Sequence, residues 1–574
     1  MPKIKHFALA GAFFLLLALL FTYPLVLDFT DSIVGGTQGD GIYFVWLVRW
    51  YQGFFLGENP HIFFNPMMNY PQGWNLSTTD TSLAALAPSI PFSILWGPVA
   101  GFNLGMWLSF VFSGLAMYAW VYRHTQSQAA SLLAGTIYAF FPNRIAHYDA
   151  GHLNLSATAW FPVYFMSLYE VLRAPQTSNW LRQRSHWGWM VACAISLGLI
   201  AFTSMYYLLF TLLITLVFVI GYAVFEPRSQ VRRLLTQPAS WLRVGITAAL
   251  SAPLLYMALR PFLALAGQGG LADRSVDYMN EYAAELTDFL APASNHFLWG
   301  GWISEIFDRS QWIEGSLYIG AVTLALVALA FVWKKELANK PLLYTAGLVM
   351  LAAMVIAMGP HLHIDRELVL INGERVPLPS LLLYNYLPFF AKMRAIMRMG
   401  LFTLLFAAFA AGLGADLLLR RIRPQWRTWA AAGLIALTLL DFYPGAYHGQ
   451  IKAVEARPVD HWLAEQPGQG AVVQLPFQRS VDQEQVFYAL THKKPFTGGF
   501  FNANQTSQFQ YLAPTLERFP DEHSVETLRE FEVEYIVIDP LDYTDFAAVQ
   551  HALANLGLVP LTEQGGLWVY TFSD

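Results

Sequence analysis

The chain has 574 residues, of which 55% are hydrophobic, 16% are aromatic and only 13% are charged. Soluble globular chains carry about a quarter charged residues, so this composition excludes an ordinary soluble protein and indicates a polytopic membrane protein. The net charge of −5 excludes a strongly basic nucleic-acid binder, and the single cysteine, Cys193, excludes an intrachain disulfide and paired-cysteine metal sites.

Apolar runs long enough to cross about 30 Å of hydrocarbon recur along the chain. The first run, 7–27, follows two lysines, and because no small-residue cleavage site comes after it, we interpret it as a membrane helix and not as a signal peptide. The other predicted spans are 102–122, 129–141, 157–172, 187–203, 206–225, 244–259, 317–333, 342–358, 400–419 and 428–443. The sequence therefore predicts a mainly α fold with about eleven transmembrane helices.

The distribution of Lys and Arg predicts the orientation of these helices. If the N-terminus is cytoplasmic, the short inner segments hold 17 of the 34 basic residues, as the positive-inside rule requires. An odd number of spans then places the C-terminal part on the outer face. We therefore predict a membrane domain at 1–445, with long outer loops at 28–101, 260–316 and 360–398, and an extracytoplasmic domain at 446–574.

The composition changes from about residue 457, where short apolar runs alternate with polar segments and turns. The segments 471–477, 534–539 and 567–572 are typical of strands. Helical patterns cover 459–465, 483–490 and 546–556. The sequence predicts a small α/β domain after the membrane part.

The first outer loop carries a candidate general base. Asp40 follows a glycine-rich turn and precedes the amphipathic aromatic segment 42–51, which we expect to lie along the membrane face. A carboxylate in this position can accept a proton from a hydroxyl group. The alternative is that Asp40 caps the following helix. Trp46 and Trp50 in that helix suit either an interfacial anchor or a carbohydrate site.

The loop 141–154 brings cationic and titratable side chains together between two predicted spans. Arg144, His147 and His152 lie where a phosphate-bearing lipid head would sit. Asp149 with the two histidines is an alternative metal site, although the spacing matches no strong ligand motif. Ordinary hydrogen bonding within the loop is a third interpretation.

Two further outer segments carry charged candidates. Arg394 and Arg398 are four residues apart, which predicts one shared helix face that can bind a lipid phosphate. The alternative is snorkelling to ordinary anionic lipid heads. The segment from Tyr282 through Glu314 carries carboxylates, including Glu285 and Asp288, and is long enough to cap a site. Its acids can equally serve only to solvate the loop.

The order of these features resembles the bacterial polytopic glycosyltransferases of the GT-C fold, relatives of protein O-mannosyltransferases and aminoarabinose transferases. The resemblance rests on the Gly-Asp turn after the first span, the aromatic helix, the Asn-Tyr-Pro segment at Tyr70, the Arg-x-x-His…Gly-His loop, the Tyr-Leu-Pro…Arg…Arg segment and the α/β tail. It implies a bacterial inner-membrane location and an essential acid in the first outer loop, which maps onto Asp40. Many members carry a second acid next to it, and here Gly41 stands in that place.

The resemblance also implies an inverting hexosyl- or pentosyltransferase that moves a sugar from a polyprenyl-phosphate donor to an envelope glycan, lipid or protein acceptor. On this view Asp40 is the general base. The donor phosphate is expected to contact Arg144, His147, His152, Arg394 and Arg398, and the sugar or acceptor Trp46, Trp50, Tyr70, Glu285 and Asp288.

Other interpretations stay open from the residues alone. A divalent cation, Mg²⁺ or Mn²⁺, is an open question, with Asp40, Asp149 and His147 as candidate ligands. The alternative functions are a transporter or flippase of lipid-linked glycans and a non-catalytic membrane protein that binds glycan.

Overall fold

The chain folds into two compact units, a helical unit and a mixed unit of helices and strands. The computed structural model describes residues 2–79, 81–173, 183–267, 273–308, 310–311, 313–445, 450–501 and 505–573. The helical unit comprises Met1–Val26, Ser82–Ala85 and Gly105–Tyr447. The mixed unit comprises Leu27–Thr81, Leu86–Leu104 and His448–Asp574.

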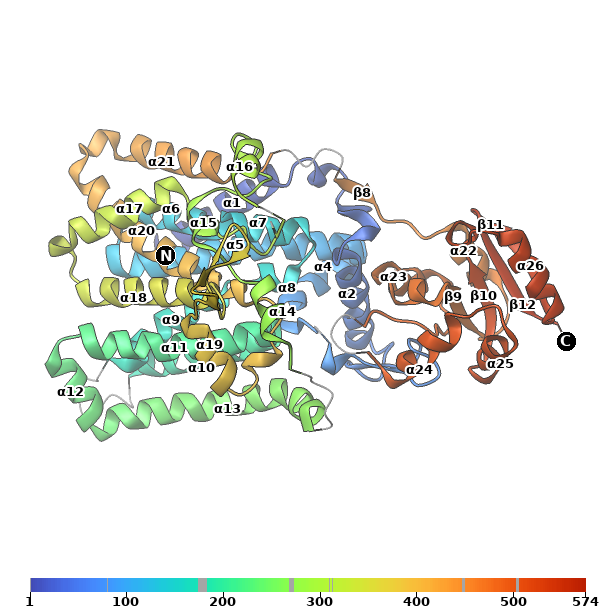
Figure 1. Cartoon of the computed structure of the whole chain (residues 1–574). Coiled ribbons are helices and arrows are strands. Elements are labelled where there is room, and N and C mark those ends of the chain that lie inside the picture. Colours follow the sequence, from blue (N-terminus) through green and yellow to red (C-terminus); the bar gives the residue numbers. More distant parts are fainter. Residues whose placement is uncertain are drawn as a thin grey trace. The chain divides into compact units, whose positions relative to one another are not determined.

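Helices occupy all eleven predicted spans in the described part of the chain (Figure 1). They are α1 (Pro2–Phe21), α5 (Pro98–Thr125), α6 (Gln128–Phe140), α9 (Trp160–Leu172), α10 (Arg184–Thr203), α11 (Met205–Phe225), α13 (Pro238–Gly267), α17 (Ala321–Val332), α18 (Lys340–Ala357), α20 (Gly400–Arg421) and α21 (Arg427–Phe442). Within the described residues, six helices are long and apolar enough to cross a membrane: α5, α10, α11, α13, α18 and α20 with the turn before it. The count of eleven spans and their orientation stay predictions.

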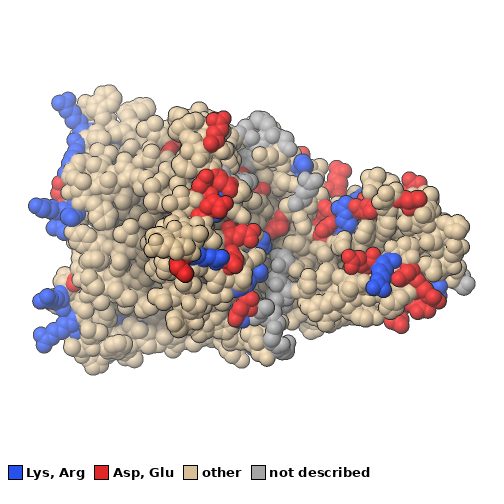
Figure 2. All heavy atoms as spheres, viewed as in Figure 1, with Lys and Arg blue, Asp and Glu red and all other residues tan. Residues whose placement is uncertain are grey.

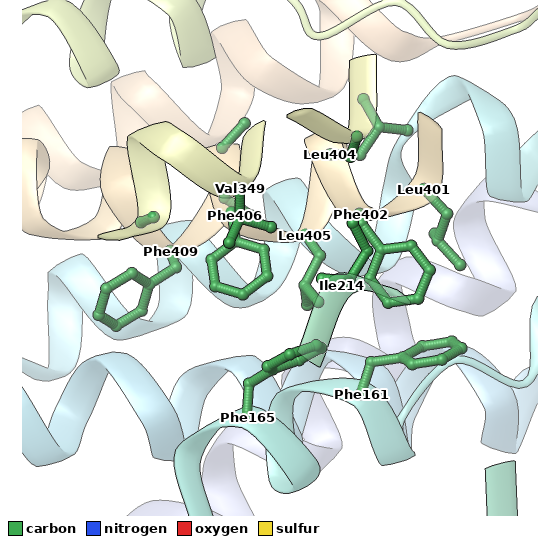
Figure 3. Close-up of a cluster of buried hydrophobic side chains, with 14 of the residues drawn as sticks. Phe161, Phe165, Ile214, Val349, Leu401, Phe402, Leu404, Leu405, Phe406 and Phe409 are labelled. Atoms are coloured by element: carbon green, nitrogen blue, oxygen red, sulfur yellow. The ribbon is translucent and has the colours of Figure 1, made fainter. Parts of the chain in front are cut away.

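Helix α20 forms the centre of the helical unit because almost all of its residues are apolar and buried. Its phenylalanines pack against rings from α9, with centroids 5.2 Å apart for Phe402 and Phe161 and 5.0 Å apart for Phe406 and Phe165. Figure 3 shows these rings together with Ile214 of α11 and other aliphatic side chains. Interlocking aromatic and aliphatic side chains thus pack the neighbouring helices against α20.

The helical unit has two chemically different ends. Lys and Arg gather at the end formed by α12 (Arg228–Thr236) and by the α17–α18 and α20–α21 connections (Figure 2). Short elements lie toward the other end, among them α7 (Pro142–Asp149), α8 (Leu153–Ser156), α14 (Val276–Glu281), α15 (Leu286–Leu290) and α16 (Gly300–Ile306) (Figure 1). The segment before α20 adds two hairpins, β4 (His363–Ile364) with β5 (Glu367–Leu368) and β6 (Leu370–Ile371) with β7 (Glu374–Arg375), then α19 (Pro379–Tyr386).

The mixed unit contains a four-stranded sheet with the order β11-β12-β10-β9. The strands are β9 (Ala471–Leu475), β10 (Val533–Ile538), β11 (Leu558–Gln564) and β12 (Leu567–Phe572), and only the β9–β10 pair is parallel. The helices of this region are α22 (Pro458–Glu465), α23 (Gln483–His492), α24 (Ser507–Leu516), α25 (Glu522–Glu530) and α26 (Phe546–Asn555). The predicted strands and helices are present, while β11, α24 and α25 were not predicted.

The first outer loop belongs to the mixed unit together with the C-terminal residues. It contains β1 (Ser32–Val34), α2 (Gly41–Phe55), β2 (Phe64–Asn65), β3 (Trp74–Asn75) and α4 (Ile90–Trp96). Strand β1 pairs with β8 (Ile451–Ala453), and α2 packs against α4 and α23. This grouping differs from the predicted division at residue 446, because the loop finds its backbone and aromatic partners in the C-terminal segment. The placement of these parts relative to a membrane stays a prediction.

Replacing Gly414 by alanine should lower the thermal stability of the helical unit. A Cβ at this position of α20 would collide with the carbonyl oxygen of Leu326 in α17 and lie 3.2 Å from the backbone nitrogen of Ala330. Backbone atoms cannot move away as a flexible side chain can, so α17 and α20 must separate to make room. We expect this separation to lower the free energy of unfolding by about 1–3 kcal/mol. Gly433→Ala is the matched control, since nothing lies within 4 Å of its Cβ position. Equal unfolding midpoints for both variants, measured in detergent, would contradict this packing.

Cysteine labelling can test the predicted orientation. Cys193 is the only cysteine and is buried, so a single exposed cysteine can be introduced into the natural background. We expect a membrane-impermeant maleimide to label Leu541→Cys in intact spheroplasts, and to label Lys335→Cys only after permeabilisation. The reverse pattern would overturn the orientation.

Candidate functional site

Asp40 lies at the start of α2 in the mixed unit. It occupies the N-cap position, but its side chain makes no capping hydrogen bond to the helix. The capping alternative is therefore wrong for this conformation. The turn before it is tied to β8, since the Gly35 N–H donates to the Gln450 carbonyl at 2.8 Å. Gly36 has a φ of +59°, and a Cβ there would lie 2.9 Å from Cβ of Lys452. Close approach to β8 thus fixes the backbone that leads to the carboxylate.

The rings of α2 form an aromatic cluster within the mixed unit. Trp46 is 1% exposed and stacks on Trp74, with ring centroids 5.6 Å apart and an interplanar angle of 19°. Trp50 also stacks with Trp46 and donates from its indole N–H to the Ile62 carbonyl at 2.8 Å. The expectation that Trp46 is an interfacial anchor is wrong, because neighbouring rings enclose its side chain. The position of α2 along a membrane face stays a prediction.

Tyr70 joins the first loop to the C-terminal segment within the mixed unit. Its backbone N–H donates to the Phe496 carbonyl at 3.0 Å, and its hydroxyl donates to Glu532 Oε2 at 2.5 Å. The hydrogen bond to Glu532 raises the pKa of Tyr70. The contacts described here hold the loop in place, and no ligand is needed to explain them.

Arg144 is buried in the helical unit, and its guanidinium donates hydrogen bonds to uncharged oxygens. Its Nε donates to the Ala139 carbonyl at 2.9 Å, and Nη1 donates to the Ser113 hydroxyl at 2.9 Å and to oxygens of Ser156 and Thr158. The guanidinium also lies 4.9 Å from the centre of the Phe110 ring. This hydrogen-bonding ties α5 to α7 and the segment after α8. A lipid phosphate could reach Arg144 only by breaking these bonds.

His147, His152, Glu314 and Arg398 come together in the helical unit and form what we call the Glu314 cluster. Arg398 donates from Nε to both Glu314 oxygens, at 3.0 and 2.9 Å, and from Nη2 to Oε1. Glu314 Oε2 lies 3.8 Å from Nε2 of His147. The Nδ1 atoms of His147 and His152 are 3.2 Å apart. Three of the predicted phosphate-binding residues therefore converge, but on a carboxylate of the chain itself.

Burial and ion pairing set the charges in the Glu314 cluster. Burial alone would raise the pKa of Glu314, but the charge and hydrogen bonds of Arg398 outweigh it and hold that pKa well below its usual range. Burial lowers the pKa of His147, and the Glu314 carboxylate opposes this only in part. At neutral pH Glu314 is thus an anion and His147 is neutral.

Glu314 is the residue that sequence reasoning did not single out. The signal was available, because Glu314 is an acid only three residues before a predicted span, and an acid that is buried needs a partner. The partner, Arg398, is far away in sequence. Only the fold brings them together.

Arg394 and Arg398 do not share a helix face. Arg394 lies in a bend between the 3₁₀ turns Phe390–Lys392 and Ile396–Met399, so the four-residue spacing does not follow a helix. The predicted common face is wrong for this reason. The Arg394 side chain is exposed, donates to the Tyr282 hydroxyl at 3.2 Å and lies over the Tyr282 ring at 5.1 Å. Its exposure makes Arg394 the more accessible cation of the two.

Glu285 and Asp288 hold the segment before β5 to α15. The two side chains form a capping box at the start of α15. Glu285 also accepts from the backbone N–H of Asp365 at 3.0 Å and from that of Arg366. Asp288 pairs with Nη2 of Arg366 at 2.8 Å. Both carboxylates are buried and hydrogen-bonded, so the structure places them in the framework of the loop.

The candidate metal ligands do not form a metal site in the described part of the chain. No group of three or more His, Cys, Asp or Glu side chains with suitable geometry occurs among the described residues. His147 contacts His152 and Glu314, and Asp149 ends helix α7. Asp40 belongs to the mixed unit, whereas the other two candidates belong to the helical unit.

Solved structures with the same fold are membrane glycosyltransferases. The chain is similar to the arabinofuranosyltransferase AftD from Mycobacteria, with 14% identity and a TM-score of 0.54 over 99% of this chain and 40% of AftD. It is also similar to the apo oligosaccharyltransferase from Archaeoglobus fulgidus, with 12% identity and a TM-score of 0.53 over 100% of this chain and 74% of that protein. The chain thus spans two fifths of the length of AftD. At these identities the likeness shows a shared fold, and it confirms the predicted GT-C type of fold.

A third structure, ArnT from Cupriavidus metallidurans bound to undecaprenyl phosphate, matches with 12% identity and a TM-score of 0.48 over 97% of each chain. No curated protein matches the sequence. Residues 52–443 match the model of a family described as "Domain of unknown function (DUF6311)". Because this match covers well over half of the chain, the protein belongs to the DUF6311 family.

Proposed function

We propose that the chain is an integral-membrane glycosyltransferase that moves a sugar from a polyprenyl-phosphate donor to a hydroxyl acceptor on the outer face of a bacterial inner membrane. The observation that carries the proposal is the fold, which this chain shares over 99–100% of its length with an arabinofuranosyltransferase and an oligosaccharyltransferase. The second support is the concentration of polar and titratable side chains in the segments between the apolar helices.

Asp40 is the proposed general base. It stands at the end of a turn whose backbone is fixed by β8, and its carboxylate is not used to cap α2. In the proposed step the acceptor hydroxyl loses its proton to Asp40 and its oxygen attacks the anomeric carbon. The bond from that carbon to the donor phosphate oxygen breaks, and the electron pair leaves with the lipid phosphate. A single displacement of this kind inverts the anomeric centre.

Arg394 is the proposed contact for the donor phosphate. An arginine can bind two phosphate oxygens at once, and the Arg394 side chain is exposed. Arg144 and Arg398, in contrast, donate hydrogen bonds to other residues of the chain. The contact with Tyr282 orients the guanidinium without neutralising it. The acceptor is an envelope glycan, lipid or protein, and a transfer assay with a panel of donors and acceptors identifies it together with the sugar.

The direct test incubates the purified full-length chain in lipid nanodiscs with labelled polyprenyl-phosphate sugars and a panel of envelope glycans, lipids and peptides. Transfer of label to one acceptor class supports the proposal and identifies donor and acceptor together. Movement of a lipid-linked glycan between the two leaflets of liposomes, with no transfer of label to an acceptor, would favour the transporter alternative.

Replacing Asp40 by asparagine should reduce transfer by at least about a hundredfold, the usual contribution of a general base. Asparagine keeps the shape of the side chain but cannot take up the proton, so expression and unfolding midpoint should not change. Asp31→Asn is the matched control, because Asp31 is an exposed acid in the same loop. Near-normal turnover of the Asp40 variant would remove the proposed base.

Replacing Arg394 by alanine should raise the KM for the lipid-phosphate donor about tenfold or more, since one charge-assisted contact is worth about 1.5–3 kcal/mol. The KM for the acceptor should stay the same. Arg375→Ala serves as the control, because Arg375 is another exposed cation of the 360–398 loop that pairs with Asp277. A donor KM equal to that of the natural chain would reassign Arg394 to lipid anchoring.

A further inference from the structure

Helix α16 exposes a face of large apolar side chains that the proposed function does not use. Trp299, at the N-cap, is 53% exposed, Trp302 is 60% exposed, and Ile306 is exposed one turn later. With 3.6 residues per turn, these three side chains fall within about 60° of one another around the helix axis. An apolar face left open in a folded chain marks a contact with another apolar body.

The other residues of α16 form a buried face and a polar face. Gly300 and Ile303 are buried, and a Cβ at Gly300 would collide with the Ser294 carbonyl oxygen, so this side packs against the chain itself. Ser304 and Glu305 are exposed on the remaining side. The helix thus has one side for protein, one for an apolar medium and one for water. This is the pattern of a helix that lies in the plane of a membrane–water interface.

The start of α16 is attached to the C-terminal end of α21 (Figure 1). Nε2 of His296 donates to the Asp441 carbonyl at 3.2 Å, and Nδ1 accepts from the backbone N–H of Trp299, also at 3.2 Å. The Phe297 ring packs edge-on against Tyr443, with centroids 5.3 Å apart. The depth of this end of α21 therefore sets the depth of α16.

Helix α21 exposes an apolar face along its length. No charged residue occurs between Arg427 and Asp441 in the sequence. The exposed residues from 429 to 440 are all small or apolar: Trp429, Ala432, Gly433, Ala436, Leu437 and Leu440. In a membrane protein an uncharged, exposed helix face contacts hydrocarbon, and the apolar face of α16 continues it at one end.

The two ends of α21 carry residues typical of membrane boundaries. Arg427 begins the helix at the cationic end of the helical unit, next to the exposed rings of Trp426 and Trp429. Tyr443 follows sixteen residues later, a rise of about 24 Å, which approaches the hydrocarbon thickness of about 30 Å. Tryptophan is enriched at both membrane–water interfaces. The rings of α16 thus stand where the second interface is expected.

We propose that α16 is an interfacial anchor and that its partner is the lipid surface of the leaflet opposite the cationic end. The face formed by Trp299, Trp302 and Ile306 enters the boundary between headgroups and acyl chains, and Glu305 points to water. Indole rings suit this boundary, because they combine a large apolar surface with one N–H donor. The inference rests on the membrane location of the chain and not on the proposed transfer reaction.

Spin labels test which medium the face contacts. Cys193 is buried, so a nitroxide can be attached to Trp302→Cys in the full-length chain in lipid nanodiscs. Oxygen concentrates in hydrocarbon, whereas a nickel chelate stays in water. Glu305→Cys on the polar face is the matched control, and Leu437→Cys gives the value for hydrocarbon. We expect the ratio of oxygen to nickel accessibility at residue 302 to be several-fold above that at 305 and below that at 437.

Three results of this experiment overturn the anchor. A ratio at 302 equal to that at 305 means that the face is in water. Low accessibility to both reagents with dipolar broadening means that a second copy of the chain covers it. Low accessibility without broadening means that the chain covers the face itself.

Photoactivatable lipids give a second test that needs no substitution. The natural chain is reconstituted with lipids that carry a diazirine either near the glycerol or at the end of the acyl chain, and the crosslinked peptides are identified by mass spectrometry. We expect residues 299–306 to crosslink mainly to the first lipid, and residues 432–437 of α21 mainly to the second. No crosslink to 299–306, or the same preference as 432–437, contradicts an interfacial position.

Discussion

Helix α20 has to be apolar on every side, and the rest of the helical unit follows from this constraint. Its residues from Gly400 to Leu417 are buried without a break, between α6, α17 and α18. Small residues permit close approach, as at Gly412 beside Ala134 of α6, and phenylalanines fill the wider gaps. Polar groups are tolerated only toward the ends of such a helix. Arg398 stands just before its start, and the Asp416–Arg420 pair lies near its end.

Buried charge is the second constraint, because each buried cation needs compensation. Arg144 is surrounded by neutral oxygens, and Arg366 is held by a capping box. Arg398 differs, since its carboxylate partner also faces a histidine. The same demand for compensation therefore makes two arginines structural and places the third in a cluster with two histidines.

Hydropathy predicted the helices well because the physical cause is local: a run of apolar residues must be removed from water wherever it lies. The same reasoning failed where the cause is non-local. Trp46 could not be recognised as a core residue, because Trp74 and the surrounding loop bury it. Glu314 could not be paired with Arg398, since no spacing links two distant segments. Strand β11 was missed because Pro560 interrupts a pattern with several exposed apolar residues, and β12 supplies the pairing that makes it a strand. The roles of Asp40 and Arg394 stay predictions from their chemistry, and their surroundings could be described only from the fold.

The C-terminal residues and the first outer loop form one compact unit. The turn before Asp40 has its strand partner in β8, and the segment around Asn69 and Tyr70 binds the backbone near Phe496 and Gly498. Gly498 has no room for a side chain, because a Cβ would collide with the Ser480 carbonyl. Loop and C-terminal segment are thus fitted to each other at backbone level. A carboxylate that must meet a hydroxyl within hydrogen-bond distance needs such a fixed backbone. If Asp40 is the base, as proposed, the C-terminal segment contributes to the reaction by fixing the position of this loop.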